Sequence, residues 1–262
     1  MSRITDTFEQ CRREKRKALV TYVTCGVPDF DRCVRIAGEL IAAGSDIIEL
    51  GVPFSDPMAD GPVIQKAGAL ALTNHTTLDD VFAMAMELRK RFPATPLILF
   101  SYYNVLFHRK RDRVCREAAA AGIDAFLVVD LPLEEQGELL PFMDQYALEL
   151  IPLISPASDA QRIQALAQKR NGFLYYITVR GVTGTGSGIA SDVASHLKLI
   201  KSITALPVVA GFGITSAASA KNCAEAGDGV VVGSAIVSKM MECPNGETAV
   251  ALVKEIAEAL RA

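Results

Sequence analysis

Short β-branched runs alternate without interruption with longer, alanine-rich segments of helical period, from about Leu19 to the end of the chain. Eight of these runs have the length and composition of strands, and a helical pattern separates each from the next. Strands joined through helices run parallel, and eight such units close into a barrel. The sequence therefore predicts an α/β protein with a (β/α)8 TIM barrel. The predicted strands are Leu19–Thr24, Ile47–Leu50, Leu97–Tyr102, Ala125–Val129, Glu149–Leu153, Phe173–Ile177, Val208–Ala210 and Val230–Val232.

No linker interrupts this pattern, so we expect residues 1–262 to form a single domain, with a short amphipathic helix before the first strand. A short motif that occurs three times supports the assignment: AGSDIIEL begins at Ala43, AGIDAFLV at Ala121 and AGDGVVVG at Ala226. Glycine ends a helix and aspartate turns the chain. Each copy therefore indicates a junction between a helix and the strand that follows it.

Charge and hydropathy argue against several classes of protein. The net charge is -3 and the isoelectric point about 5.7, which leaves no basic face for a polyanion. The N-terminus is polar and no apolar stretch reaches the ~20 residues of a membrane span, so we expect a cytoplasmic enzyme. The six cysteines form no CxxC pair, which favours reduced thiols over a zinc site or a disulfide framework.

The stretch IIELGVPFSDPMADGP places a single glutamate in an apolar strand. Side chains alternate between the two faces of a strand, so Glu49 should point the same way as Ile47, into the space that the sheet encloses. Gly51 and Pro53 end the strand and leave Glu49 at its carboxyl end, where barrels hold their reacting groups. An apolar mouth would raise the pKa of Glu49 and suit it to act as both acid and base. The alternative is a strand-end glutamate satisfied by backbone donors.

Asp60 lies on the loop directly after that strand and could form a catalytic pair with Glu49 that handles two protons of one substrate. Alternatively, Asp60 caps a helix or belongs to a common Asp-Gly turn. Asp56 is interpreted as a turn or contact residue. Asp56 and Asp60 together could hold Mg²⁺, but the sequence offers no further convergent carboxylate, so we predict no metal site.

Two irregular segments should leave the same face of the barrel. Ile47 and Leu97, which begin the second and third predicted strands, are 50 residues apart, so extra chain follows the second strand. Residues 180–191, after the sixth strand, read RGVTGTGSGIAS and contain four glycines. Long loops in compact domains are usually functional or disordered.

Glycine-rich turns late in the chain predict a phosphate site. They lie at residues 181–188, 211–215 and 231–237, and the last two follow the seventh and eighth strands. Small residues let backbone amides and a helix N-terminus approach an anion, and loops after these two strands form the recurring phosphate site of such barrels. We expect a phosphate-binding helix after strand eight, capped by Ser234, which would also donate its hydroxyl. The alternative for each turn is tight packing.

Aromatic and aliphatic side chains at inward positions near the strand ends suit a flat apolar group, although such residues are more often core. The predicted pocket therefore binds phosphate at one end and a ring at the other, with acids between. No lysine ends a strand, which disfavours Schiff-base chemistry, and the histidines show no triad pattern. The inward positions are Tyr22, Phe100, Tyr102, Leu127, Val129, Tyr175 and the loop residue Phe212.

Together these segments resemble the α-subunit family of tryptophan synthase over nearly the whole chain. The matching pieces include ELGVPFSDPMADGPVIQ, SYYN, FLVVDLPLEE, LIPLISPAS, GVTG, LPVVAGFGI and GVVVGSAIV. The resemblance implies retro-aldol cleavage of indole-3-glycerol phosphate to indole and glyceraldehyde 3-phosphate. That substrate has the ring, the hydroxyl and the phosphate that the predicted pocket requires.

The resemblance also implies roles for individual residues. Glu49 would protonate the indole carbon that bears the side chain and take the proton of the adjacent hydroxyl, while Asp60 would bind the ring N–H. Tyr175 would contact the glycerol chain, and Thr183 would latch the loop after the sixth strand onto Asp60. The phosphate would bind Gly184, Gly213, Gly233 and Ser234, and the indole would lie among Tyr22, Phe100, Leu127 and Phe212.

By the same resemblance, the chain itself holds no cofactor and docks on a β-subunit that carries pyridoxal phosphate, as an α₂β₂ complex with an indole tunnel. Residues 53–60, including Pro53, Asp56 and Pro57, would form much of that contact together with residues 104–108, beginning at Asn104. Rival interpretations are another phosphate-binding barrel, such as a sugar-phosphate isomerase, a catalytically weak regulatory subunit, and a lyase that works alone. The first of these usually places lysine, histidine or metal ligands at strand ends, which this sequence lacks.

Overall fold

The computed structural model describes residues 2–168, 172–177, 187–211 and 213–261. Its strands are all parallel and form one sheet in the order β5-β4-β3-β2-β1-β9-β8-β7-β6. The strands are β1 Ala18–Thr24, β2 Ile47–Gly51, β3 Leu97–Ser101, β4 Ala125–Val128, β5 Glu149–Leu150, β6 Leu153–Ile154, β7 Leu174–Ile177, β8 Val208–Gly211 and β9 Gly229–Val232.

The two ends of this sheet are halves of one short segment, which closes the sheet into a barrel. The amide of Ile151 donates to the carbonyl of Phe126 in β4 at 2.8 Å, and the next carbonyl, that of Pro152, accepts from Tyr175 in β7 at 3.0 Å. The predicted barrel is confirmed, but the prediction of one continuous fifth strand is wrong. Proline lacks the N–H that a ladder needs, so β5 and β6 are separate on either side of Pro152.

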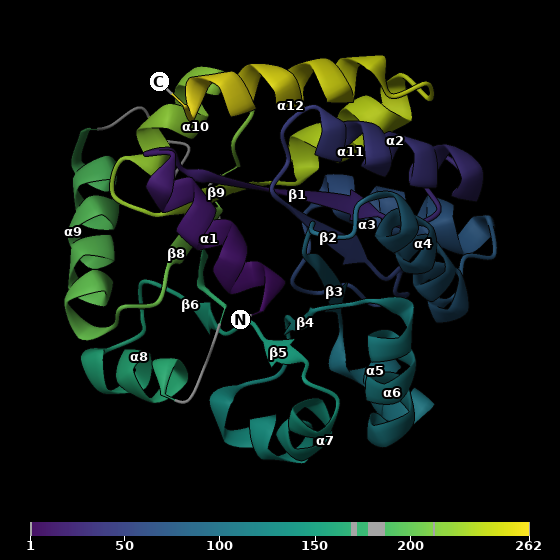
Figure 1. The fold of residues 1–262 in the computed structure, drawn as a ribbon, viewed down its shortest axis with the longest axis horizontal. Helices are drawn as coiled ribbons and strands as arrows, with labels where there is room; N and C mark the ends of the chain where they lie inside the picture. The colour runs from purple at the N-terminus through teal and green to yellow at the C-terminus, as the bar shows by residue number, and fades with distance from the viewer. Residues whose placement is uncertain (1, 169–171, 178–186, 212, 262) are drawn as a thin grey trace.

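Helices surround the sheet in a ring (Figure 1). They fill the connections between successive strands, as the alternating pattern predicts. Two helices, α3 and α4, occupy the long connection between β2 and β3, so most of the extra chain there is helix rather than loop. The helices are α1 Arg3–Arg13, α2 Phe30–Ala42, α3 Pro62–Thr73, α4 Leu78–Arg91, α5 Tyr103–Arg109, α6 Arg111–Ala121, the 3-10 helix η1 Leu133–Glu138, α7 Leu140–Gln145, α8 Ala160–Ala167, α9 Ser187–Ile203, α10 Ala217–Ala224, α11 Ser234–Glu242 and α12 Glu247–Ala259.

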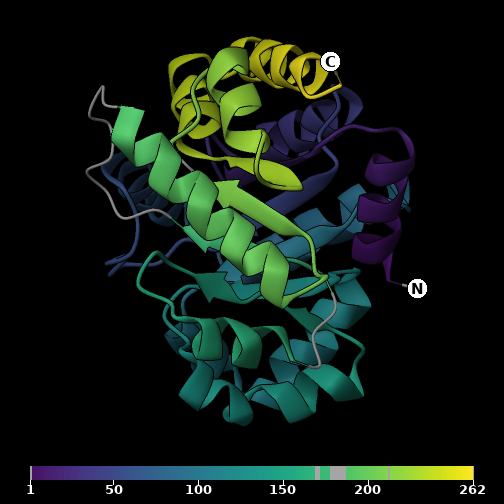
Figure 2. The ribbon, with the colours of Figure 1, turned by 90° about the vertical axis from the view of Figure 1, so that its left-hand side faces the viewer.

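The barrel interior is a layered apolar core that α1 closes at one end. Ile4 and Phe8 of α1 belong to the same buried cluster as Ile47, Leu127 and other inward residues of the strands. The ring of Phe8 lies 5.5 Å from that of Phe173. Figure 2 shows α1 apart from the outer helices, at the end of the molecule where the chain begins. The amino ends of the strands are therefore covered, and the opposite mouth is left for a site.

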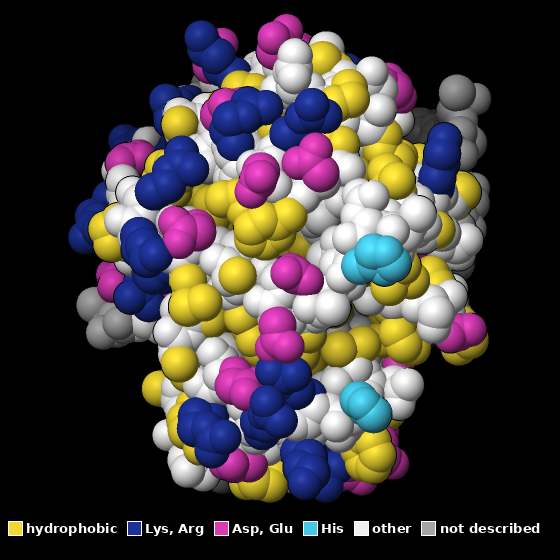
Figure 3. Space-filling view, turned by 90° about the vertical axis from the view of Figure 1, so that its right-hand side faces the viewer, with side chains coloured by type: hydrophobic (Ala, Val, Ile, Leu, Met, Phe, Trp, Pro, Cys, Tyr) yellow, Lys and Arg dark blue, Asp and Glu magenta, His cyan; other side chains and the backbone are white. Residues whose placement is uncertain are grey.

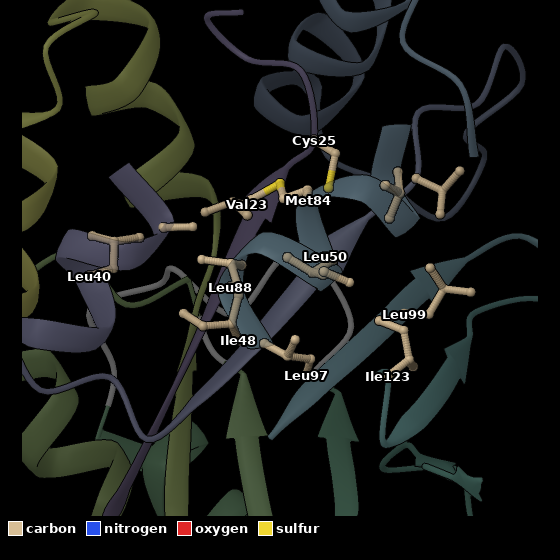
Figure 4. Packing of buried hydrophobic residues seen from close by; sticks show 14 of the residues in the cluster. Val23, Cys25, Leu40, Ile48, Leu50, Met84, Leu88, Leu97, Leu99 and Ile123 are labelled. Atoms are coloured by element: carbon tan, nitrogen blue, oxygen red, sulfur yellow. The ribbon is translucent and has the colours of Figure 1, made fainter. Parts of the chain in front are cut away.

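The outward face of the strands packs against the ring of helices. Figure 4 shows Ile48 and Leu50 of β2 and Leu97 of β3 lying against Met84 and Leu88 of α4. Ile48 therefore points away from Ile47, into the outer layer, and this alternation turns Glu49 inward.

The repeated motif, in which an aspartate follows Ala-Gly directly or after one residue, has a structural basis in paired hydrogen bonds. Asp46 donates its amide to the carbonyl of Leu19 at 2.8 Å and accepts from the Leu19 amide through Oδ2 at 2.9 Å. Asp228 makes the same two bonds with Val208, at 2.8 and 2.9 Å. Each aspartate thus joins the start of its own strand to the start of a neighbouring one, and Asp124 does the same in the copy that begins at Ala121.

The surface carries charges of both signs, in agreement with the small net charge of the chain. Figure 3 shows acidic and basic side chains interspersed over one face. All six cysteines are free thiols. In the described part of the chain, no helix is long and apolar enough to cross a membrane.

Candidate active site

Glu49 is a fully buried acid at the carboxyl end of β2, with a relative exposure of 0%. It pairs with Tyr22 of β1 and with Ile98 of β3 across the sheet. Neither of its carboxylate oxygens has a hydrogen-bond partner among the described residues. Burial raises the pKa of Glu49 to about 8. Within the described ranges no backbone donor satisfies Glu49, and its side chain lies on the interior side of β2 with that of Ile47.

Asp60 lies on the loop between β2 and α3, and its carboxylate turns toward β3. Its Oδ2 accepts a hydrogen bond from the phenol of Tyr102 at 3.1 Å. The helix cap of α3 is Gly61, which has no side-chain capping bond, so the alternative of Asp60 as a helix cap is wrong. The side chain is half-buried, which leaves it accessible from the mouth.

Both acids lie within electrostatic reach of the same two phenols. Burial raises the pKa of Tyr175 well above its usual value, and the negative charges of Glu49 and Asp60 add to this effect. Burial likewise raises the pKa of Tyr22, again with contributions from Asp60 and Glu49. Tyr22 and Tyr175 therefore lie near both acids, and Tyr22 pairs with Glu49 across the sheet and lines a pocket with Asp60.

Aromatic side chains form one wall of this space. The rings of Tyr22 and Phe100 meet edge to face at 5.0 Å. A Cβ at Gly51 would lie only 2.1 Å from the Tyr22 hydroxyl, so glycine at the end of β2 makes room for that phenol. Leu127 is fully buried in the interior cluster, against which Phe100 and Tyr175 pack. The structure therefore brings Tyr22, Phe100, Leu127 and Tyr175 together, whereas Tyr102 contacts the loop that carries Asp60. Phe212 lies outside the described residues.

A small pocket opens beside this wall, with about 210 Å³ of empty space including open solvent. Tyr22, Asp60 and Ile64 are among its lining residues. The pocket connects the inward face of β1 with the loop that carries Asp60. Phe54, which also lines it, was not singled out from the sequence; its ring stacks on Tyr102 at 4.9 Å.

The turns after β8 and β9 lie side by side, because these strands are neighbours. Gly213 has a φ of +62° and is exposed, with open space where a Cβ would be. Gly233 is the N-cap of α11 and makes no side-chain capping bond. Ser234 is exposed and is the first residue of α11, so the prediction that Ser234 caps this helix is wrong. Exposed amides at a helix start favour an anion. Thr183 and Gly184 lie outside the described residues.

The residues predicted to face a partner differ in exposure. Asp56 and Asn104 are exposed, Pro57 is half-buried and Pro53 is buried. Two large hydrophobic side chains in the same segments are exposed: Met58 by 89% and Phe107 by 56%. Neither residue was predicted individually from the sequence. Both are large apolar residues within segments predicted to lie on the surface, and this could have identified them.

Within the described ranges, no three His, Cys, Asp or Glu side chains gather in a way that could hold a metal ion. The site has the features of an acid–base centre, with one buried carboxyl group of raised pKa and a second that is hydrogen-bonded.

Comparisons with known proteins agree with this arrangement. Residues 8–262 match the family model of the tryptophan synthase alpha chain. The tryptophan synthase alpha chain of Citrifermentans bemidjiense is 46% identical over 237 residues, covering 90% of this chain and 88% of that one. The one from Polynucleobacter necessarius is 40% identical and covers 99% of both chains. A crystal structure of tryptophan synthase subunit alpha from Legionella pneumophila has a TM-score of 0.93 at 34% identity, covering 99% of this chain and 98% of that one. The protein therefore belongs to the tryptophan synthase alpha chain family, whose members are lyases of the tryptophan synthase reaction.

Proposed function

We propose that this protein cleaves indole-3-glycerol phosphate to indole and glyceraldehyde 3-phosphate, with Glu49 and Asp60 as its catalytic residues. The observation that carries the proposal is the fully buried carboxyl group of Glu49, which has no hydrogen-bond partner in the described part of the chain and whose pKa is raised to about 8. Burying such a group costs free energy, and it is typical of a site where the proton is used.

Glu49 handles both protons of the cleavage. In its protonated form it donates to the indole carbon that bears the glycerol chain, which makes that carbon tetrahedral. The carboxylate then accepts the proton of the hydroxyl on the adjacent chain carbon. The bond between these two carbons breaks, its electron pair returns to the indole ring, and the hydroxyl carbon becomes the aldehyde. Glu49 ends the cycle protonated, as it began.

Asp60 stabilises the positive charge that appears on the ring when the carbon is protonated. Its carboxylate would accept a hydrogen bond from the ring N–H, which strengthens as the charge develops. Its position on the loop beside Tyr22 and Tyr175 supports this role. The two acids thus have different roles: Glu49 transfers protons and Asp60 stabilises the charge on the ring.

The remaining pocket fits the two ends of the substrate. Tyr22, Phe100 and Leu127 supply the apolar surface for an indole ring, with Tyr175 near the glycerol chain. The amides of Gly213, Gly233 and Ser234 lie at the neighbouring turns after β8 and β9 and would bind the phosphate. The roles of Thr183, Gly184 and Phe212 stay predictions, as does a single domain over residues 1–262. None of these steps calls for a cofactor in this chain.

The test is indole release from indole-3-glycerol phosphate by the wild type and by Glu49→Gln, measured with and without a β-subunit. Glu149→Gln is the matched control. Glu149 also lies in a strand, has an unpartnered Oε2 and has a pKa raised by burial, but it stands at the start of β5, at the opposite end of the barrel. We expect Glu49→Gln to lose at least about 100-fold in kcat and Glu149→Gln to stay within about threefold of the wild type.

Indole release by Glu49→Gln at the wild-type rate would reject the role of Glu49. No release by the wild type under any condition would instead favour a regulatory subunit. A wild-type rate that is already high without a β-subunit would indicate a lyase that works alone.

We also propose that the chain docks on a β-subunit that binds pyridoxal phosphate, in an α₂β₂ complex. The exposed Met58 and Phe107, in the segments 53–60 and 104–108, support an interface there. The test compares Met58→Asp with Met86→Asp, a methionine on α4 that is 44% exposed. We expect the first substitution to weaken binding to a β-subunit at least about tenfold and the second to leave it unchanged. Equal effects would contradict the assigned face, and the mass of the complex tests the stoichiometry.

A further inference from the structure

We propose that Tyr102 is a positioning residue that holds the carboxylate of Asp60 in place and ties the loop 53–60 to the start of α5. This inference rests on the proposed role of Asp60 in catalysis. It gives Tyr102, which the sequence places only among the ring-binding residues, a second and separate task.

The phenol of Tyr102 makes two hydrogen bonds to adjacent residues of the loop. It accepts from the amide of Ala59 at 3.0 Å and donates to Oδ2 of Asp60 at 3.1 Å. A hydroxyl has one proton to donate and lone pairs to accept, so both bonds form at the same time. Together they fix the backbone before Asp60 and the orientation of its carboxylate.

The ring of Tyr102 holds the other end of the same loop. It stacks on Phe54 with ring centres 4.9 Å apart and planes inclined by 24°. The side chain of Tyr102 is only 4% exposed. One buried residue therefore contacts the loop near its start, at Phe54, and at its end, at residues 59 and 60.

The backbone of Tyr102 is itself fixed. It is the N-cap residue of α5, and its carbonyl accepts from the Ser101 hydroxyl at 3.0 Å and from the Val105 amide at 3.3 Å. The phenol thus links the start of α5 to the loop 53–60 through a fixed side chain. Burial raises the pKa of Tyr102, and the charge of Asp60 adds to this, so the phenol keeps the proton that it donates.

The position of Asp60 thereby depends on the position of α5. Residues 104–108 lie within this helix and were proposed to contact the partner. A shift of α5 would be transmitted through the phenol to the carboxylate, without any change in Glu49. Positioning of this kind affects the rate of the chemical step more than the binding of the ring.

The test is Tyr102→Phe, which keeps the stacked ring and removes both hydrogen bonds. We expect kcat for indole release to fall about 5- to 20-fold, with KM within about twofold of the wild type. The control is Tyr103→Phe. Its phenol also donates to a carboxylate, that of Glu138 at 2.8 Å, but on the outer surface, and we expect its kcat to stay unchanged.

A second measurement follows the loop itself. Amide hydrogen exchange of residues 58–60 should become at least about threefold faster in Tyr102→Phe, because the Ala59 amide loses its acceptor. Tyr103→Phe should leave that exchange as in the wild type.

An unchanged kcat in Tyr102→Phe, or a raised KM with kcat kept, would overturn the positioning role and leave Tyr102 as part of the pocket wall. Unchanged exchange at residues 58–60 would overturn the anchoring of the loop. Failure of the wild type to release indole would reject the proposed function instead, and the exchange experiment would then decide the anchoring by itself.

Discussion

Asp124 and Leu97 exchange two hydrogen bonds between the starts of neighbouring strands. The Asp124 amide donates to the Leu97 carbonyl at 2.9 Å, and the Asp124 carboxylate accepts from the Leu97 amide at 2.8 Å. The same carboxylate pairs with Arg3 of α1 at 2.8 Å and with Arg89 of α4 at 2.7 Å, and its side chain is only 8% exposed. One aspartate therefore joins two strands, the helix that closes the barrel, and a helix of the outer ring.

Removing this carboxylate should destabilise the barrel strongly. Asp124→Ala removes the acceptor of the Leu97 amide and the carboxylate that balances the charge of Arg89, which keeps its bonds to backbone carbonyls. We expect the free energy of unfolding to fall by about 3–5 kcal/mol. Urea denaturation followed by circular dichroism measures this. Glu87→Ala is the control, because Glu87 pairs with Lys90 on the surface and its loss should cost less than about 1 kcal/mol. Equal losses in the two variants would contradict the prediction.

The buried carboxyl group of Glu49 should make stability depend on pH. Its pKa is about 8 in the folded protein against an ordinary 4.5, so the folded state binds more protons between these values. The contribution of Glu49 to the free energy of unfolding is therefore fully present below pH 4.5 and is lost as pH rises through 8. Glu49→Gln has no proton to lose, so it should be more stable than the wild type at pH 9, by at most about 5 kcal/mol.

Chemical denaturation at pH 5 and pH 9 tests this as a difference between the two proteins, which removes the effect of other titrating groups. Glu87→Gln, an exposed position on α4, is the control and should differ from the wild type by no more than about 0.5 kcal/mol at either pH. A difference between Glu49→Gln and the wild type that does not grow with pH would show that the carboxyl group is not desolvated.

The ionisation of Glu49 should also appear in the pH dependence of catalysis. The free enzyme needs Glu49 in its protonated form to begin the reaction, and its pKa is about 8. We expect kcat/KM for indole-3-glycerol phosphate to be level up to about pH 7 and to fall about tenfold per pH unit well above pH 8. Steady-state rates between pH 6 and 10 measure it. A profile that stays level to pH 10 would mean that the proton donor is another group.

The turn after β8 should tolerate no side chain if it binds phosphate. Gly213 has a φ of +62°, which disfavours any residue with a Cβ, and the space beside it is open. Gly213→Ala should lower the free energy of unfolding by about 1 kcal/mol. A methyl group there should also raise KM about 5- to 20-fold with kcat kept within about twofold, because it holds the phosphate away from the amide.

Gly137→Ala is the matched control, since a Cβ at Gly137 also meets nothing within 4 Å but the residue lies in η1 rather than in the turns after β8 and β9. Both its stability and its KM should stay close to those of the wild type. An unchanged KM in Gly213→Ala would remove Gly213 from the phosphate site.

Local pattern was enough to predict the barrel and the inward direction of Glu49. The alternation of strand and helix segments depends on neighbouring residues alone, and the two-residue period of a strand turns Glu49 to the side of Ile47 whatever the rest of the chain does. The same rules predict the first and last residues of helices and strands less well. The strand broken at Pro152 and the N-cap of α11, which is Gly233 rather than Ser234, depend on hydrogen bonds that the period does not specify.

The sequence by itself determined which residues line the barrel, because periodicity and turn residues act over a few positions. Tertiary structure alone decided which of them meet. Tyr102 reaches Ala59 and Asp60 across more than 40 residues of chain, through two helices whose packing sets the path of the loop. Whether Glu49 finds a hydrogen-bond partner also depends on every strand around it. Contacts of this kind arise from the summed packing of distant segments, which no local pattern encodes.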